Sequence, residues 1–254
     1  MARPILAWPG GKRRLAKHIL PLFDSPHQCY VEPFAGGAAL LFMRATPAPV
    51  EVLNDMHSEL VHLYRCVRHH LDELVRQFRW ALASREMFEW AKMERPETLT
   101  DIQRAARFLF LQKLAFGAKV SGHTFGTSAM QPPRLNLLRL EEDLSAAHLR
   151  LARVTIEHLP WQDCIRRYDR PETLFYLDPP YWQTEGYANA FPWPEYEQLA
   201  EVMATLQGRA ILSINDHPDI RRVFSRFKHR KLSTTYTIGG DKKPAGELLI
   251  TTWK

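Results

Sequence analysis

Short apolar runs separated by helix-like segments most constrain the fold of this chain. Each run stops at a polar or turn residue, and the five are CYVEPFA (29–35), VEVLND (50–55), VTIEHL (154–159), TLFYLD (173–178) and AILSIND (210–216). Such runs suit strands that helices cover on both faces. Helix-like segments lie between most of them, at 13–22, 38–45 and 194–207. The alternation predicts an α/β fold with a doubly wound parallel sheet.

The last two apolar runs have a different connection. LSTTYTI (232–238) and ELLITTW (247–253) are joined only by the short link GGDKKPAG. A link of this length is too short for a helical crossover and is typical of a hairpin. We therefore expect an antiparallel hairpin added at the edge of the sheet.

A long interruption separates the second and third runs. Residues 58–147 contain no convincing strand, while 59–82 and 101–116 have helical periodicity. The stretch 117–134 follows them and is rich in Gly, Ser, Thr and Pro. We expect a main domain formed by 1–57 and 148–254, with an inserted, mainly helical subdomain at 58–147.

The composition narrows the cellular compartment in which we expect this chain and the kind of partner it binds. A chain of 254 residues can bury a core without disulfides or metal. Its three cysteines, Cys29, Cys66 and Cys164, match no metal or redox spacing, and no apolar run approaches the roughly 18 residues of a membrane span. We expect reduced thiols and a cytoplasmic protein without a signal peptide. The net charge of +6, concentrated near the C-terminus, favours a polyanionic partner.

A glycine turn and an acid suggest a nucleoside site. In VEPFAGGAALLF (31–42), a strand runs into Gly36 and Gly37 and then into a helix, so that the backbone can approach a ligand. The second strand ends at Asp55, where an acid can hold ribose hydroxyls. An ordinary tight turn and a helix N-cap explain each part alone. The pair is stronger evidence than either part.

The N-terminal segment AWPGGKRRLAKHI adds a second glycine turn. Trp8 and Lys12 flank its two glycines, and a helix-like segment follows. Lys12 can meet a carboxylate or a phosphate there. Taken alone, the segment is better explained as an ordinary surface turn.

The stretch YLDPPYW (176–182) carries the most chemistry. Asp178 stands at the carboxyl end of a predicted strand, where open α/β sheets bind ligands. Pro179 and Pro180 lack N–H groups, so carbonyls are the backbone groups left for hydrogen bonding. Acceptors without donors fit an –NH2 group, and Tyr181 offers a ring on which a planar base can stack. We interpret the motif as a site for the exocyclic amine of a nucleobase, although a capped turn would explain D-P-P alone.

Seven motifs in order give the chain a resemblance to a known family. WPGGK, EPFAGGAALLF, NDMHSEL, FLFLQKLAFG, LDPPY, LSIND and GELLITTW, spanning 8–253, resemble the Dam family of DNA adenine N6-methyltransferases (D12 class, α group). The resemblance implies a Rossmann-like methyltransferase sheet with an inserted helical target-recognition subdomain. It also implies S-adenosyl-L-methionine as methyl donor, S-adenosyl-L-homocysteine as product, and no metal.

The resemblance implies roles for individual residues. The expected catalytic residues are Asp178, Pro179, Pro180 and Tyr181. The expected cofactor-binding residues are Trp8, Gly10, Lys12, Glu32, Pro33, Phe34, Gly36, Gly37, Asp55, Asp163 and Asp178. The expected DNA-binding residues are Lys119, Ser121, His123, Thr124, Arg134 and Lys242. The expected partner is double-stranded DNA, bound by a monomer of bacterial, phage or prophage origin.

The expected mechanism follows from the poor nucleophilicity of the adenine amine, whose lone pair is delocalised into the ring. Hydrogen bonds from its two hydrogens to Asp178 and the Pro179 carbonyl would localise that lone pair for attack on the sulfonium methyl group. The base must first be flipped out of the duplex. Tyr181 would hold it, with Trp182 or Tyr187 nearby.

Two departures from the family limit the expectation. Ala38 stands where many relatives have the last glycine of the turn. The loop AKVSGHTFG replaces the N-G-L-x-R-Y-N-like stretch of many relatives, so the GATC target is not carried over. A cytosine-N4 or RNA amine acceptor, and an inactive DNA-binding relative, remain as alternatives. The target sequence and a paired restriction enzyme stay open.

Overall fold

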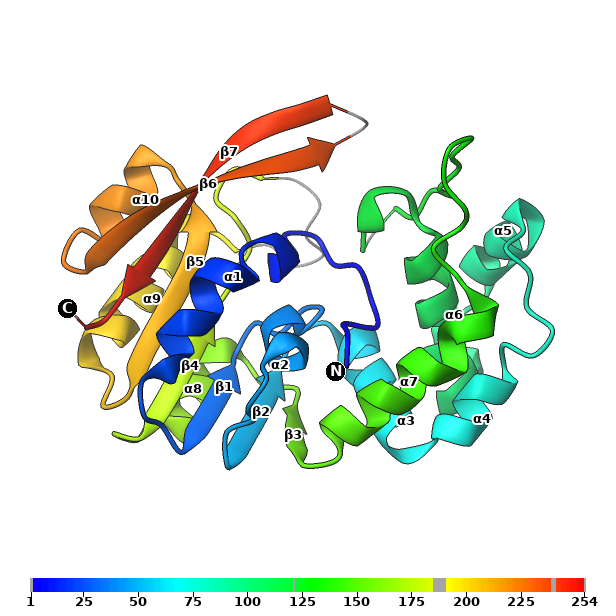
Figure 1. The fold of residues 1–254 in the computed structure, drawn as a ribbon, viewed down its shortest axis with the longest axis horizontal. Helices are drawn as coiled ribbons and strands as arrows, with labels where there is room; N and C mark the ends of the chain where they lie inside the picture. The colour runs from blue at the N-terminus through cyan, green and yellow to red at the C-terminus, as the bar shows by residue number, and fades with distance from the viewer. Residues whose placement is uncertain (1, 121, 185–190, 239–240, 254) are drawn as a thin grey trace.

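A seven-stranded sheet forms the centre of the molecule (Figure 1). The structure is a computed structural model that describes residues 2–120, 122–184, 191–238 and 241–253. The strand order is β3-β2-β1-β4-β5-β7-β6, with β1 to β5 parallel and β7 antiparallel to β5. The strands are β1 (Cys29–Glu32), β2 (Val50–Asn54), β3 (Val154–Glu157), β4 (Thr173–Leu177), β5 (Arg209–Asn215), β6 (Lys228–Ile238) and β7 (Asp241–Thr251). The predicted α/β fold, with its parallel sheet and edge hairpin, is confirmed.

Helices cover both faces of this sheet, which explains why the parallel strands are mainly apolar. Successive strand residues point to opposite faces, so Tyr176 of β4 joins one buried core while Phe175 and Leu177 join the other. The first core lies against α1 (Ala16–Ile19), α2 (Ala39–Met43) and the inserted helices. The second lies against α8 (Trp161–Tyr168), α9 (Trp193–Thr205) and α10 (Pro218–Val223).

The predicted helix at 13–22 is divided into three short elements. A 3-10 turn (Lys12–Arg14), α1 and a second 3-10 turn (Leu20–Asp24) follow one another. Pro21 stands at the start of the second turn, and its missing N–H prevents the α-helical hydrogen bond that would continue α1. The helices expected at 38–45 and 194–207 are present as α2 and α9.

The insertion is helical, as predicted, but its helices differ in detail. They are α3 (Ser58–His69), α4 (Leu71–Arg76), α5 (Arg85–Met93), α6 (Asp101–Leu114) and α7 (Leu137–Leu151). The single helical stretch expected at 59–82 is interrupted at His70, whose φ of −135° and ψ of 43° lie outside the helical region. The helix expected at 101–116 is α6, whereas α5 and α7 were not predicted.

The insertion shares its hydrophobic core with the sheet. Leu60 of α3, Leu109 of α6 and Leu144 of α7 belong to the same buried cluster as Leu174 and Tyr176 of β4. The predicted boundary at 147 falls inside α7, which continues to Leu151 and leads directly into β3. The insertion helices therefore pack mainly on one another, beside the β3 edge of the sheet, and their core is continuous with that of the main domain (Figure 1).

The hairpin strands are longer than the sequence suggested. The expected link GGDKKPAG is wrong as a loop, because β6 and β7 pair as far as Ile238 and Asp241. Only residues 247–251 of β7 also pair with β5, so the outer half of the hairpin extends beyond the sheet (Figure 1). Pro244 lies in this outer half, where β7 has a paired neighbour on one side only and a missing N–H is tolerated.

A buried ion pair fastens the end of the insertion to the sheet. Arg150 of α7 donates to both carboxylate oxygens of Glu51 on β2, at 2.5 and 2.8 Å. Its Nε and Nη2 atoms also donate to the carbonyl of Leu41 on α2, at 3.2 and 3.0 Å. The Glu51 side chain is only 4% exposed. Loss of the arginine would therefore leave a buried carboxylate without its principal cation.

We expect Arg150→Ala to lower the free energy of unfolding by about 3 kcal/mol or more, because an uncompensated buried charge remains. Urea denaturation followed by circular dichroism measures this change. Arg139 is the matched control, because it also lies on α7 and pairs with a glutamate, Glu142, but both side chains are exposed. Arg139→Ala should change stability by less than about 1 kcal/mol. Equal losses in the two variants would contradict a structural role for the buried pair.

Candidate functional site

A large cleft opens at the carboxyl ends of the parallel strands. The strand order reverses between β1 and β4, and such switch points are where open α/β sheets bind ligands. The cleft has a volume of about 2270 Å³. Of the residues predicted to bind cofactor, substrate or DNA, it is lined by Trp8, Gly10, Lys12, Glu32, Pro33, Phe34, Gly36, Gly37, Asp55, Lys119, Arg134, Asp178, Pro180 and Tyr181. Motifs far apart in the sequence thus meet at one place.

Asp55 fixes the glycine turn that forms one side of the cleft. Its carboxylate accepts hydrogen bonds from the backbone N–H groups of Gly36 and His57, both at 2.8 Å. Burial raises the pKa of Asp55, and these two hydrogen bonds oppose the rise. The N-cap of α3 is His57, whose ring accepts from the Leu60 N–H. Asp55 is therefore not the helix cap that the sequence left open as an alternative.

Gly36 has to be glycine at this turn. Its φ is +49°, and a Cβ atom would lie 2.6 Å from Cδ1 of the Trp8 indole. Tyr64 of α3 donates to the Gly36 carbonyl at 2.7 Å. Ala38 is also left-handed, with φ 48° and ψ 39°, although it carries a Cβ atom. That conformation costs roughly 1–2 kcal/mol in a non-glycine residue, and the complete burial of Ala38 holds it in place.

Asn54 is a buried residue that the sequence analysis missed. Its side-chain N–H groups donate to the carbonyls of Pro33 and Leu159, at 2.9 and 3.0 Å. Its side-chain oxygen accepts from the Leu159 N–H at 2.8 Å. Asn54 thereby joins the ends of β1, β2 and β3. The signal in the sequence was an amide at the end of an apolar run.

An ion pair lies at the centre of the cleft. Lys12 Nζ is 2.7 Å from Asp178 Oδ1 and donates to the Gly10 carbonyl at 2.6 Å. Ser213 of β5 donates to the same Oδ1 atom at 3.2 Å. Burial raises the pKa of Asp178, and Lys12 is the first of the groups that lower it. No described residue donates a hydrogen bond to Asp178 Oδ2, so that oxygen is the one left for a ligand.

The two prolines after Asp178 have different surroundings. The Pro180 carbonyl accepts from the Tyr196 hydroxyl at 2.7 Å. Among the described residues, none donates to the Pro179 carbonyl. Asn215 of β5 then holds the next stretch, because its side chain accepts from the Trp182 N–H and donates to the Trp182 carbonyl. Asp178 Oδ2 and the Pro179 carbonyl are thus acceptors to which no described residue donates, although Pro179 is buried and, unlike Asp178, does not line the cleft.

The Tyr181 side chain is contacted at its hydroxyl and on the face of its ring. Its hydroxyl lies 2.7 Å from each carboxylate oxygen of Glu247 on β7, to which it donates. Lys12 Nζ lies over the ring, 4.7 Å from its centroid. The tyrosine is buried and lines the cleft. Glu247 was not among the predicted site residues.

Three aromatic rings form an apolar part of the cleft. Phe34, Trp161 and Phe191 lie with centroids 5.7 to 6.4 Å apart, and all three line the cleft. We call these residues the aromatic cluster. Trp161 and Phe191 were missed, although Trp161 follows the third apolar run at a strand's carboxyl end. Trp182, expected near the base, packs instead against Trp193 and Tyr196 and does not line the cleft, and Tyr187 lies outside the described residues.

Glu32 brings a second acid to the cleft. It accepts hydrogen bonds from the Tyr30 hydroxyl at 2.8 Å and the Leu41 N–H at 3.0 Å. Burial raises the pKa of Glu32 to about 8. Burial thus favours the protonated form of Glu32, and a cationic ligand would favour its ionised form.

The prediction for Asp163 is not supported by its position. It lies on α8, its carboxylate pairs with Arg166, and it does not line the cleft. Trp161 does line the cleft, and a residue two positions further along a helix lies about 200° around the axis, given 3.6 residues per turn. Asp163 therefore lies on a different side of α8 from Trp161.

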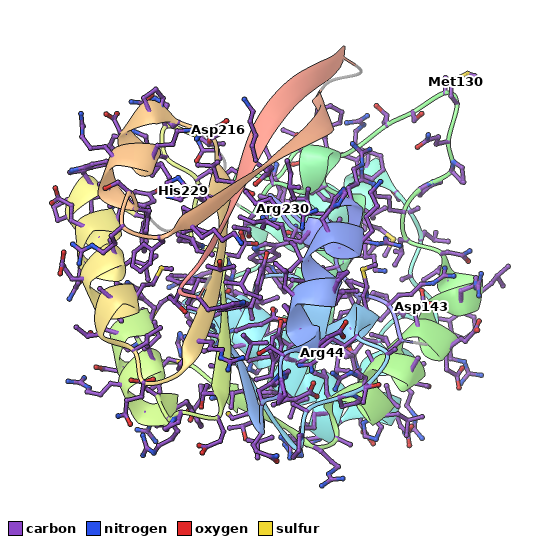
Figure 2. The ribbon with its side chains drawn as sticks, turned by 60° about the vertical axis from the view of Figure 1, so that its left-hand side comes forward. Arg44, Met130, Asp143, Asp216, His229 and Arg230 are labelled. Atoms are coloured by element: carbon purple, nitrogen blue, oxygen red, sulfur yellow. The ribbon has the colours of Figure 1, made fainter. Side chains whose placement is uncertain are left out.

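The predicted DNA-binding residues are dispersed. Lys119 and Arg134 are exposed and line the cleft, and Thr124 is exposed outside it. The tip of the 117–134 loop lies far from the sheet, where Met130 projects into solvent (Figure 2). His123 is half-buried, contacts Gln112 at 3.4 Å, and has its pKa lowered by burial. Ser121 and the side chain of Lys242 lie outside what the structure describes.

In the part of the chain that the structure describes, no group of three or more His, Cys, Asp or Glu side chains could hold a metal ion. Within the same residues, no helix has the length and apolar character needed to cross a membrane. The three cysteines are free thiols.

Comparison with known proteins agrees with the geometry. The family model for D12 class N6 adenine-specific DNA methyltransferases matches residues 8–238. The type II methyltransferase M.CviBI of Paramecium bursaria Chlorella virus NC1A is 26% identical, over 98% of this chain and 97% of its own. The type II methyltransferase M1.LlaDCHI of Lactococcus lactis subsp. cremoris is 24% identical, over 99% and 95%. The DNA adenine methylase of Escherichia coli K12 is 26% identical, over 97% and 94%.

The matched region contains the glycine turns, Asp55, the D-P-P-Y motif and the whole insertion. This chain therefore belongs to the D12 class of N6 adenine-specific DNA methyltransferases, and it transfers a methyl group from S-adenosylmethionine to adenine in DNA.

Proposed function

We propose that the cleft is where the methyl donor and the adenine amine meet, with Asp178 and the Pro179 carbonyl holding the amine. The observation that carries this proposal is that protein donors occupy some of the acceptor atoms around Asp178 and leave others unoccupied. Lys12 and Ser213 contact Asp178 Oδ1, and the Tyr196 hydroxyl donates to the Pro180 carbonyl. Within the described residues, Asp178 Oδ2 and the Pro179 carbonyl keep their lone pairs, which fits a group with two hydrogens.

The residues around the glycine turns fit S-adenosylmethionine. Gly36 lets the Trp8 indole pack directly against the turn, so that the turn and the indole together line the cleft. Asp55 retains lone pairs that can accept ribose hydroxyls, and the aromatic cluster offers faces for the adenine ring of the cofactor. Lys12 can pair with the carboxylate of the methionine part. When bound, the cofactor supplies an electrophilic methyl group on a sulfonium ion.

The protein prepares the acceptor nitrogen for attack. Two hydrogen bonds, to Asp178 and the Pro179 carbonyl, favour a tetrahedral amine with a localised lone pair. As the new N–C bond forms, the nitrogen must release a proton. Asp178 is the adjacent base, and its burial, which raises its pKa, makes it a better proton acceptor. Tyr181 would hold the ring of the base after flipping.

We propose double-stranded DNA as the substrate, bound by a monomer in the cytoplasm of a bacterial host. Lys119 and Arg134 are exposed and line the same cleft, where cationic side chains can contact phosphates. Two of the relatives carry the name type II methyltransferase. This supports methylation at a specific short sequence, as in a restriction-modification system.

We expect Asp178→Asn to lower the methyl-transfer rate by about a hundred- to a thousandfold. Lys12 and Ser213 both donate to the Oδ1 position, so the amide oxygen should lie there. The amide –NH2 group would then face the hydrogens of adenine. Transfer of tritiated methyl groups to unmethylated phage DNA measures the rate. Asp163→Asn is the control and should leave the rate unchanged, whereas an active Asp178→Asn enzyme would remove the proposed mechanism.

Asp55→Ala should raise the Michaelis constant for S-adenosylmethionine by roughly ten- to a hundredfold, because hydrogen bonds to a charged group are lost. The Michaelis constant for DNA should change little. Tyr64→Phe is the control for a loosened glycine turn, since it removes only the hydrogen bond to the Gly36 carbonyl. An equal rise of the Michaelis constant for S-adenosylmethionine in both variants would mean that Asp55 only holds the glycine turn and does not contact the cofactor.

Lys119→Ala and His123→Ala should differ, because Lys119 is exposed and His123 is half-buried against Gln112. Lys119→Ala should weaken DNA binding uniformly across sequences and reduce the salt slope by about 1. His123→Ala should leave the salt slope unchanged. Fluorescence anisotropy at several salt concentrations gives the slopes, and methylation of a randomised DNA pool gives the site preference. A changed preference in His123→Ala alone would instead assign base reading to the histidine.

A further inference from the structure

Glu247 is a fully buried carboxylate that the mechanism above does not use. It lies on β7, is 0% exposed, and has both oxygens 2.7 Å from the Tyr181 hydroxyl. A buried carboxylate is costly to a fold unless hydrogen bonds or a cation compensate it. At the edge of the reaction centre, an apolar residue could fill the same volume without that cost. The carboxylate therefore suggests a task beyond packing.

We propose that Glu247 is a positioning residue that fixes the Tyr181 ring for the flipped adenine. This inference rests on the proposed function, in which Tyr181 holds the base. A tyrosine ring without a partner at its hydroxyl can rotate and tilt about its side-chain bonds, so its face is poorly defined. A hydroxyl held by both oxygens of a buried carboxylate has its direction fixed from the far end of the ring.

The backbone around Glu247 makes it a rigid anchor. Glu247 pairs with Asn215 of β5 on one side and with Leu232 of β6 on the other. Asn215 in turn holds both backbone groups of Trp182. Glu247 and Asn215, which are paired neighbours on β7 and β5, thus hold two consecutive residues. Glu247 holds the side chain of Tyr181, and Asn215 holds the backbone of Trp182. The hairpin added at the sheet edge supplies half of this support.

The charge of Glu247 also acts on the electrons of the ring. A phenol that donates to a carboxylate gains electron density, which strengthens the attraction between its face and positive charge. Lys12 Nζ lies over that face and also contacts Asp178. Glu247 therefore influences Tyr181 and Lys12, which lie beside Asp178, the residue proposed to hold the reacting amine. Its loss should lower the rate of the chemical step more than the affinity for the cofactor.

A double-mutant cycle on kcat tests the proposal, with unmethylated phage DNA and tritiated S-adenosylmethionine. Glu247→Leu should lower kcat by roughly ten- to a hundredfold, the equivalent of a hydrogen bond to a charged group. The Michaelis constant for the cofactor should stay within about twofold. In the Tyr181→Phe background, which lacks the hydroxyl, Glu247→Leu should lower kcat by much less, because the two residues act through one contact.

Conservative variants and a matched pair complete the design. Glu247→Gln keeps the shape and an acceptor oxygen, so it should retain the fold and lose less activity than Glu247→Leu. If Glu247→Leu fails to fold, the same cycle is run with Glu247→Gln. Tyr168 donates to Glu157 at 2.7 Å away from the cleft, so it is a second tyrosine–carboxylate pair. Glu157→Leu should leave kcat unchanged.

Two results would overturn the proposal. One is an equal loss of kcat from the Glu247 change in the presence and absence of the Tyr181 hydroxyl. The other is a lowered melting temperature with unchanged kcat, which would make Glu247 a structural residue only. Both leave the proposed function standing as long as Asp178→Asn remains inactive. An active Asp178→Asn enzyme would overturn the proposed function itself.

Discussion

The site depends on keeping a carboxylate ionised at the buried end of a strand. Asp178 must accept hydrogen bonds, yet burial favours its neutral form. Lys12 compensates it at 2.7 Å, and this ion pair ties the N-terminal segment across the ends of β1 and β4. The glycine turn beside Trp8 then fits against the same segment, since only glycine at position 36 leaves room for the indole. The cleft is thus built around one ion pair.

The sequence predicted what depends on local pattern. The parallel strands were clear because each is a short, mainly apolar run, and Asp55 and Asp178 were clear because they follow such runs. Contacts between distant segments had no local signal. Tyr181 and Glu247 lie 66 positions apart and are joined only because β7 inserts beside β5. Likewise, the sequence could not show that Asp163 lies on α8 at a position that does not line the cleft.

The insertion and the cofactor side of the cleft are parts of one structure. Gln112 of α6 donates to the Ala7 carbonyl at 3.1 Å and contacts His123 of the loop. Trp8, His57 and Phe108 of α6 form a continuous aromatic contact, with centroids 5.5 and 5.4 Å apart. A displacement of α6 would therefore change the packing around Trp8. If the cofactor binds beside Trp8 and the insertion binds DNA, as proposed, the two binding events should be energetically coupled.

Under the proposed function, two acceptors recognise the amine, and selectivity for the base must lie elsewhere. Ser213, Lys12 and Tyr196 each hold an oxygen near the reaction centre. The two acceptors left over among the described residues fit any –NH2 group, including the N4 amine of cytosine. Discrimination in favour of adenine must therefore come from the ring that carries the amine. A Tyr181 face fixed from behind by Glu247 can favour one ring shape over another, whereas a freely tilting face cannot.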